Sequence, residues 1–246
     1  MNVLGIDIGG SGIKGAIVDI ETGTLKSERL RVATPQPATP ATVTEATADL
    51  VGMFDWHGPV GCGFPAVIQQ GVAKTAANID PAWIGVNVEA LLQEKTGCRC
   101  TVINDADAAG LAEMTFGAGQ GRLGMVIVLT LGTGIGSALF YQGRLIPSLE
   151  LGFLPLKGRP AEHYAAAAVR KKDKLSWKVW SGRLNRFLAH VERLFSPELI
   201  IVGGGVSRNH EKFFPYLTTQ AEITPARMLN QAGIVGAACF AANEQP

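Results

Sequence analysis

The chain lacks an excess of charge of either sign. Its 246 residues include 22 lysines and arginines against 21 aspartates and glutamates, which leaves a net charge of +1. General nucleic-acid binders carry a broad basic surface, so we expect no nucleic-acid partner. Any anion-binding site in this chain must therefore be local.

Long apolar runs are also missing. No stretch approaches the roughly 18 apolar residues that a transmembrane helix needs, and the first residues lack the basic region of a signal peptide. We therefore expect no membrane partner and a cytoplasmic location. Apolar residues still make up 47% of the chain, which is enough for a substantial core.

Cysteine is scarce, and the cysteines are Cys62, Cys98, Cys100 and Cys239. Cys98 and Cys100 are not followed by a matching Cys or His pair, so we expect no zinc site. Without an export signal, reduced thiols are the expected state.

What the chain does contain is one glycine-rich pattern that occurs twice. Residues 6–18 and 129–140 align if one gap is allowed at Ser11: an apolar strand, a polar residue, a glycine turn and a second apolar strand. A further glycine, Gly23 or Gly143, then leads into a third short apolar stretch. The repeat predicts a duplicated β-hairpin and two similar lobes.

The remaining pattern predicts strands that alternate with helices. Strands are expected at 3–18 (a hairpin), 25–32, 60–64, 100–103, 126–131, 136–140 and 197–202, and helices at 42–54, 88–95, 105–116, 162–169, 177–194 and 232–242. Residues 34–40 are too rich in proline for either and predict a loop. The fold class is therefore α/β with two lobes, and ligands are expected at the glycine turns, in the cleft between them.

The first glycine turn has the composition of a phosphate site. It contains Asp7, Gly9, Gly10, Ser11, Gly12 and Lys14. Glycines let backbone N–H groups approach phosphate oxygens, and Lys14 adds a positive charge. Asp7 can hold Mg²⁺, usually through water. The spacing is not that of a Walker A loop, and a tight hairpin that simply needs glycine is the alternative.

The second copy offers a matching site with Thr130, Gly132, Thr133 and Gly134. Hydroxyl groups and unobstructed backbone amides suit terminal phosphates. A third glycine loop, formed by Gly203, Gly204 and Gly205, follows an apolar strand and has room for an adenine ring or a ribose. A purely structural turn is the alternative for this third loop.

Polar residues at the start of the predicted helix 105–116 suit an acceptor hydroxyl. Asp105 can accept a proton from a sugar hydroxyl that attacks phosphorus, and Asn104 can hydrogen-bond another hydroxyl. The alternative is that Asp105 or Asp107 only caps the helix. Glu150 and Asn78 lie in loops that suit polyol recognition, although simple surface loops would look the same.

Residues 170–174 form a basic segment, Arg-Lys-Lys-Asp-Lys. Such a segment is most often a solvated turn. A track for a long polyanion is the second interpretation.

Together these motifs resemble the ROK family of sugar kinases, within the actin-like ATPase superfamily. The resemblance runs from Gly5 to Ala238. Its specific parts are residues 7–14, 34–40, 75–78, 83–85, 104–113, 130–136 and 203–207.

The resemblance implies a duplicated, ribonuclease H-like fold. The N-terminal lobe would span 1–104 and be completed by the last helix at about 232–243, and the C-terminal lobe would span 105–231. The implied activity is transfer of a terminal phosphoryl group from polyphosphate or ATP to the 6-hydroxyl of glucose. Family members of this kind are typically Mg²⁺-dependent homodimers.

Roles for individual residues also follow from the resemblance. Asp105 matches the catalytic base, and Asn104 and Glu150 match sugar ligands. The two glycine turns match the phosphate sites, and residues 203–205 match the loop on the nucleotide side.

Two departures from the family pattern stand out. No cysteine follows Glu150 until Cys239, so the zinc motif of many members is not expected here. Phe153 stands where the family has a sugar-binding His, and Phe cannot hydrogen-bond. That change keeps open an ATP-dependent kinase for mannose or N-acetylmannosamine, or a catalytically weak sugar-binding relative. Six residues precede Asp7, so we expect no DNA-binding domain of the kind that ROK repressors carry.

Overall fold

The computed structural model describes residues 1–244, which fold into two compact units. The first unit comprises Met1–Ala112 and the C-terminal segment from Gln231 onward, and the second is Glu113–Asn230. The first boundary falls inside helix α3 (Asp105–Phe116), whereas the sequence places the lobe boundary just before this helix.

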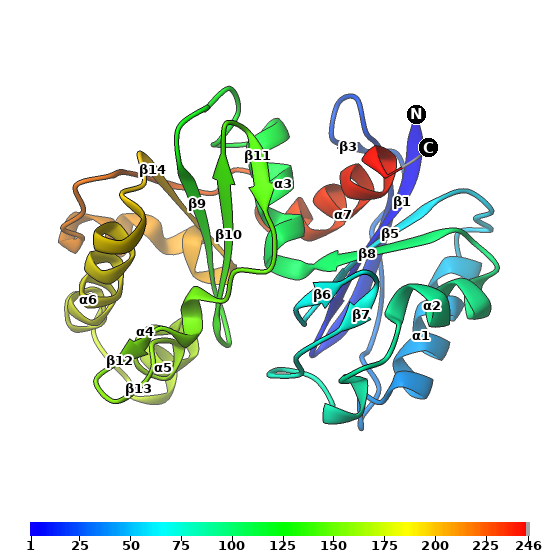
Figure 1. Cartoon of the computed structure of the whole chain (residues 1–246), viewed down its shortest axis with the longest axis horizontal. Coiled ribbons are helices and arrows are strands. Elements are labelled where there is room, and N and C mark those ends of the chain that lie inside the picture. Colours follow the sequence, from blue (N-terminus) through cyan, green and yellow to red (C-terminus); the bar gives the residue numbers. More distant parts are fainter. Residues whose placement is uncertain (245–246) are drawn as a thin grey trace. The chain divides into compact units, whose positions relative to one another are not determined.

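A mixed sheet forms the centre of the first unit (Figure 1). Its strand order is β3-β2-β1-β5-β8, and β4 also pairs with β2. The hairpin strands β1 and β2 are antiparallel, and β5 and β8 continue the sheet in parallel with β1. The strands are β1 (Asn2–Gly9), β2 (Gly12–Asp19), β3 (Thr24–Leu25), β4 (Leu30–Val32), β5 (Val60–Phe64) and β8 (Cys100–Asn104).

The second unit repeats this arrangement, with strand order β11-β10-β9-β14-β15. Again an antiparallel hairpin, β9 and β10, is followed by parallel strands. The strands are β9 (Val126–Leu131), β10 (Ile135–Tyr141), β11 (Arg144–Ile146), β14 (Leu199–Gly203) and β15 (Glu222–Pro225). The predicted duplicated α/β fold is confirmed by this shared order.

Helices cover both faces of the first sheet. On one face, α1 (Pro40–Gly52) and α2 (Val88–Thr96) pack over a core that includes Leu4, Ile6 and Ile8 of β1. On the other face lie α7 (Ala232–Asn243) and the start of α3. The chain therefore returns from the second unit to finish the first.

Three glycines let α7 lie directly on its neighbours. A Cβ atom on Gly5 would lie 2.1 Å from the Ile234 carbonyl oxygen, and one on Gly61 would lie 1.9 Å from that of Ala237. A Cβ on Gly236 would lie 1.6 Å from the Ala108 carbonyl oxygen of α3. Backbone thus meets backbone at each point, which no larger residue would allow.

The core of the second unit lies between its sheet and α6 (Trp177–Phe195). Apolar side chains of β9 and β14 pack against Trp180, Leu184 and Phe187 of this amphipathic helix. Shorter elements border this core: β12 (Pro155–Leu156), β13 (Arg159–Pro160), α4 (Glu162–Ala165) and α5 (Ala167–Lys172). The first unit carries a similar small hairpin, β6 (Ile68–Gln69) and β7 (Val72–Ala73).

Glu113 fastens the two ends of the second unit to each other. Its buried carboxylate accepts N–H bonds from Arg227 (3.1 Å) and Met228 (2.7 Å), just before the chain leaves the unit. A further bond comes from the N–H of Ala118 at 2.9 Å. One buried side chain therefore organises both segments that lead to the first unit.

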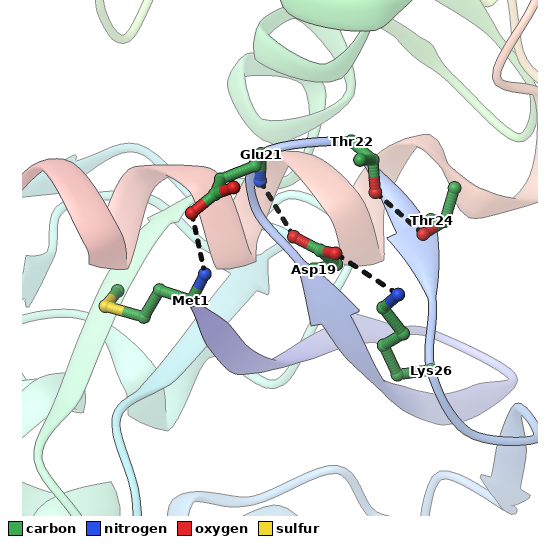
Figure 2. Close-up of polar contacts among 6 residues, drawn as sticks. All are labelled: Met1, Asp19, Glu21, Thr22, Thr24 and Lys26. Atoms are coloured by element: carbon green, nitrogen blue, oxygen red, sulfur yellow. Dashed lines mark hydrogen bonds and ion pairs between the residues drawn. The ribbon is translucent and has the colours of Figure 1, made fainter.

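The turn between β2 and β3 is held by polar contacts (Figure 2). The Asp19 carboxylate accepts the Glu21 N–H at 3.1 Å and pairs with Lys26 at 3.2 Å. These two interactions, in that order of size, lower the pKa of Asp19. The N-terminal amine pairs with Glu21 at 3.2 Å, which ties the start of β1 to the same turn.

The single strand predicted over 25–32 was wrong. The chain forms two short strands, β3 and β4, with residues 26–29 between them. The Ile17 N–H donates to the Ser27 hydroxyl at 3.0 Å instead of to a backbone carbonyl. A side-chain oxygen thus replaces a ladder bond, and the strand is interrupted there.

The single helix predicted over 162–169 was also wrong. It is broken at Ala166, whose ψ of 155° is extended, into α4 and α5. The indole N–H of Trp180 donates to the Ala165 carbonyl at 2.9 Å, which takes an acceptor that a continuous helix would use. The basic residues 170–172 consequently form the last turn of α5.

All four cysteines are buried and none forms a disulfide. Burial raises the pKa of Cys100 and of Cys239 to about 11, so these thiols are neutral at physiological pH. Within residues 1–244, no helix combines the length and the apolar character that crossing a membrane requires.

The glycine contacts of α7 give a stability prediction. We expect Gly61→Ala to destabilise the protein by about 1–3 kcal/mol or more, because its Cβ must push the Ala237 backbone away. The control is Gly52→Ala in α1, where a Cβ meets nothing within 4 Å. That change should be neutral or stabilise by up to about 1 kcal/mol. Denaturant midpoints of both variants measure this, and equal midpoints would contradict the packing role of Gly61.

Candidate active site

The first glycine turn, at the ends of β1 and β2, is held by side chains from residues 31–36. The Thr34 hydroxyl donates to the Gly9 carbonyl, and the Gln36 amide reaches the Gly10 carbonyl at 3.5 Å. Arg31 donates to the Ser11 carbonyl at 2.6 Å. Because three of its carbonyl groups accept these hydrogen bonds, the backbone of the turn is held in one preorganised conformation.

The glycines of this turn are not explained by backbone strain. Gly9, Gly10 and Gly12 all lie outside the left-handed region of φ. A Cβ on Gly10 would only touch the Asn78 carbonyl oxygen, at 3.7 Å. The interpretation that a tight hairpin simply needs glycine here therefore loses its main support, and the contact brings the Asn78 segment next to the turn.

A row of charged residues crosses the sheet just below the turn. Lys14 of β2 stands opposite Asp7 of β1 on one side and Arg31 of β4 on the other. The Lys14 ammonium lies 3.1 Å from the Asp7 carboxylate, and both side chains are partly exposed. A Cβ on Gly233 in the first turn of α7 would lie 3.1 Å from the Asp7 carboxyl carbon. Asp7 is therefore placed by Lys14 and by the positive end of α7.

Asn104, and not Asp105 or Asp107, caps helix α3. Its side-chain oxygen accepts the N–H groups of Ala106 (2.9 Å) and Asp107 (3.1 Å), and its amide donates to the Ala66 carbonyl at 3.1 Å. The residue is buried. Asn104 thus has the capping role that the sequence analysis considered, as an alternative, for Asp105 or Asp107, and one amide N–H remains for a ligand.

Asp105 starts α3 at the carboxyl end of β8. One of its carboxylate oxygens accepts its neighbour's N–H, that of Ala106, at 2.8 Å, and the side chain is partly exposed. Its Cα lies 3.6 Å from a Cβ built on Gly63, the strand partner of Asp7. Since β8 is two strands from β1, roughly 10 Å separate the two acids. The first unit therefore brings Asp7, Lys14, Asn78, Asn104 and Asp105 to one edge.

The second glycine turn joins β9 to β10. The Gly132 N–H donates to the Gly134 carbonyl, and the Gly132 carbonyl accepts the Ala168 N–H of α5, both at 3.0 Å. Gly132 lies outside the left-handed region of φ, and a Cβ there would meet nothing within 4 Å. Open space beside Gly132 and Thr133, both exposed, is what a phosphate group requires.

The third glycine loop adjoins the second turn. Gly203 is the strand partner of Thr130, so both lie at the same edge of the sheet. Gly204 has a φ of +77°, and a Cβ there would lie 2.5 Å from the Leu131 carbonyl oxygen. Gly204 is therefore required by the fold, whereas Gly205 meets nothing within 4 Å. The structural interpretation therefore applies to Gly204, and a role of Gly205 on the nucleotide side stays a prediction.

Glu150 has an acidic neighbour that the sequence analysis missed. Burial, and then the charge of Glu162, raise the pKa of Glu150. The Glu162 carboxylate is held by the Ile135 N–H at 3.2 Å, at the start of β10. Two carboxylates beside one strand end are a good acceptor pair for sugar hydroxyls. The one feature of the sequence that marks Glu162 is that this acid stands among basic residues, with Lys157 and Arg159 before it and Arg170 after it.

The remaining predicted positions are less enclosed. Phe153, in the family's His position, is 44% exposed. Among residues 1–244, no group of three or more His, Cys, Asp or Glu side chains could by itself hold a metal ion. Each unit thus contributes its own set of polar residues, with Asp7 and Asp105 in the first and Glu150 and Glu162 in the second.

Comparison with known proteins shows to which family this chain belongs. The sequence model of the ROK family matches residues 3–150, more than half of the chain. The chain belongs to the ROK family. It is 47% identical to the polyphosphate glucokinase of Mycobacterium tuberculosis over 235 residues, which cover 95% of this chain and 89% of that protein.

Two solved structures are also similar to this chain. The inorganic polyphosphate/ATP-glucomannokinase of Arthrobacter sp. matches this ROK protein with a TM-score of 0.96 and 50% identity, covering 99% of both chains. A ROK family glucokinase from Streptomyces griseus, solved with glucose and AMPPNP, has a TM-score of 0.84 at 24% identity and covers 99% of this chain and all of its own. This second match supports the fold alone.

The environment of Glu150 gives a prediction on stability against pH. A raised pKa means that ionising Glu150 costs more in the folded protein than in the unfolded chain, so this cost is complete above the folded-state pKa and absent well below the ordinary value of 4.5. We expect Glu150→Gln to raise the melting temperature at pH 7, and the gain to vanish as the pH falls below 4.5.

Thermal melts from pH 4 to pH 8 test this expectation. Glu94→Gln, an exposed position on α2, is the matched control and should follow the wild type at every pH. A gain for Glu150→Gln that stays constant with pH would contradict the role of its charge.

Proposed function

We propose that this protein is a sugar kinase that transfers a terminal phosphoryl group from polyphosphate or ATP to the 6-hydroxyl of glucose. The single observation that carries the proposal is the 47% identity, over 95% of the chain, to a polyphosphate glucokinase. The structural neighbour described as a polyphosphate/ATP-glucomannokinase supports both donors. The site geometry supports the chemistry, because each unit offers a glycine turn with room for phosphate beside acidic residues.

Asp105 is the proposed catalytic base. Phosphoryl transfer needs positioning and charge neutralisation more than covalent help from the protein. The Asp105 carboxylate at the start of α3 is held by the Ala106 N–H, which donates to it, and can accept the proton of the attacking hydroxyl. Asn104, Glu150 and Asn78 are proposed to bind the other sugar hydroxyls, and Glu162 joins them on the evidence of its contacts.

The two glycine turns are proposed to hold the phosphates. Lys14 supplies positive charge in the first turn, and Thr130 and Thr133 supply hydroxyl donors in the second. Residues 203–205 would border the nucleotide when ATP is the donor. Exclusion of water around the sugar would limit wasteful hydrolysis of the donor.

Mg²⁺ is the proposed metal. Mg²⁺ usually keeps several waters and binds one or two carboxylates together with substrate phosphates. Asp7 fits that pattern, since it is a partly exposed carboxylate beside a phosphate-type turn. Bound there, the ion would neutralise charge on the donor phosphates, while Lys14 at 3.1 Å orients the Asp7 carboxylate.

A second candidate acceptor is mannose. The Arthrobacter neighbour is described as a glucomannokinase, and the exposed Phe153 lacks the hydrogen bond that the family's His would give. N-acetylmannosamine stays a weaker alternative on the same ground. A homodimer and a cytoplasmic location are also proposed, from the family resemblance and from the four unpaired buried thiols, and light scattering measures the first.

A phosphorylation assay tests the proposed function. Glucose, mannose and N-acetylmannosamine are each supplied with ATP or with long polyphosphate, in the presence of Mg²⁺. We expect glucose 6-phosphate from both donors. Asp105→Asn should lower kcat by about 10²- to 10⁴-fold while glucose still binds. Asp49→Asn, an exposed acid on α1, is the control and should match the wild type.

Each other outcome changes the assignment. Turnover of another hexose alone would favour the second candidate. Failure with every pair would support a sugar-binding relative without activity. Full activity of Asp105→Asn would remove Asp105 as the base.

The basic segment at the end of α5 is proposed to guide long polyphosphate. Between residues 157 and 193 the chain has ten Lys and Arg but three Asp and Glu. The Ala168 N–H of α5 bonds to Gly132, and Lys172 follows about 6 Å further along this helix. Arg170 is held over the Trp177 ring at 3.7 Å, and Asp173 pairs with Arg183 at 3.0 Å. The exposed lysines 171 and 172 are thus left to meet a polyanion.

We expect the double change Lys171→Ala and Lys172→Ala to raise the KM for long polyphosphate about three- to tenfold, because each exposed charge contact contributes up to about 1 kcal/mol. The KM for ATP should change less than twofold. Lys95→Ala with Lys212→Ala, at exposed positions elsewhere, is the control of equal charge. Equal changes in the KM for polyphosphate and for ATP would contradict the proposal that this segment guides polyphosphate.

A further inference from the structure

Arg31 is a basic residue at the first glycine turn that no motif contains. It lies at the centre of the three-residue strand β4, opposite Lys14 of β2. Its guanidinium donates to the Ser11 carbonyl at 2.6 Å, so a side chain from a different strand reaches the tip of the β1–β2 hairpin. The residue is exposed, which leaves it accessible to a ligand.

Gly12 leaves the space that this guanidinium occupies. A Cβ on Gly12 would lie 2.5 Å from Nε, 2.7 Å from one terminal nitrogen and 2.8 Å from the central carbon of Arg31. The φ of Gly12 is outside the left-handed region, so the turn does not need glycine there for its backbone. The missing side chain is instead what allows Arg31 to lie flat against the turn.

The charge balance at the turn points the same way. Asp7 offsets the charge of Lys14 at 3.1 Å, whereas no ion pair of Arg31 occurs within residues 1–244. The bond to Ser11 uses one of the five guanidinium N–H donors. A planar guanidinium with donors to spare matches phosphate oxygens in a bidentate manner.

We propose that Arg31 is a binding residue for the phosphate chain of the phosphoryl donor, seated in place by Gly12. This inference rests on the proposed kinase function. It adds a side-chain contact to a turn that would otherwise hold phosphate through backbone N–H groups and Lys14. A purely structural Arg31, which only braces the Ser11 carbonyl, is the competing explanation.

Three variants separate the two explanations. Arg31→Gln keeps an amide N–H for Ser11 but removes the positive charge. Arg31→Lys keeps the charge but removes the planar guanidinium and its paired N–H donors. Gly12→Ala keeps the arginine and its charge but displaces the guanidinium from the space beside residue 12. Arg29→Gln, an exposed arginine directly before β4, is the control for loss of one positive charge.

The measurements are the KM for ATP, the KM for glucose and the melting temperature. Losing a charge-assisted hydrogen bond should raise the KM for ATP about tenfold or more in Arg31→Gln. Arg31→Lys should fall between this variant and the wild type, Gly12→Ala should resemble Arg31→Gln, and Arg29→Gln should match the wild type. The KM for glucose and the melting temperature should stay unchanged throughout.

Calorimetric binding of tripolyphosphate and of ADP, without sugar, separates a failure of this inference from a failure of the proposed function. If the wild type phosphorylates no sugar but binds these anions, a tenfold loss in Arg31→Gln still supports the assignment of Arg31. Anion affinity within twofold of the wild type in Arg31→Gln would overturn it. A melting temperature and glucose KM that change together with the donor KM would also overturn it, in favour of the structural role.

Discussion

The direct contact of α7 with β1 and β5 is the constraint on which the first unit depends. It exists because residues 5, 61 and 236 carry no side chain, so that the helix backbone touches both strands and α3. This contact brings the first turn of α7 against Asp7 and holds the start of α3 beside Gly63. The positions of two candidate functional acids, Asp7 and Asp105, therefore depend on the packing of small residues as well as on their local polar contacts.

Local patterns in the sequence were sufficient for the central strands of both sheets, although β15 was not predicted. Alternating apolar residues around a glycine turn identified both hairpins, and their repetition identified the duplication that the strand orders confirm. The errors arose where a distant side chain replaced a backbone partner. Ser27 took the bond of Ile17, and Trp180 took the carbonyl of Ala165. Periodicity cannot reveal such substitutions, because the competing group lies in another element.

In the candidate site, too, local sequence predicted some features, whereas others depend on residues far along the chain. Glycine composition located the turns, but it could not say why each glycine is present. Gly204 is needed for its positive φ, Gly12 gives room to Arg31, and Gly132 has open space beside it. Arg31 and Glu162 went unrecognised because their significance depends on register and on neighbours far along the chain. The cap of α3 falls on Asn104, whereas the alternative considered from the sequence was Asp105 or Asp107, since all of these are good capping residues.

The Glu113 contacts have a topological consequence. The second unit begins at Glu113 and ends two residues after Met228, and one carboxylate holds these ends together. A unit with adjacent ends enters and leaves its host chain at a single place. It is therefore an insertion in the first unit, and α7, which follows it in the chain, packs on the sheet of the first unit. Contacts within the first unit accordingly join residues that are far apart in the sequence, such as Gly5 and Ile234, with the whole second unit between them along the chain.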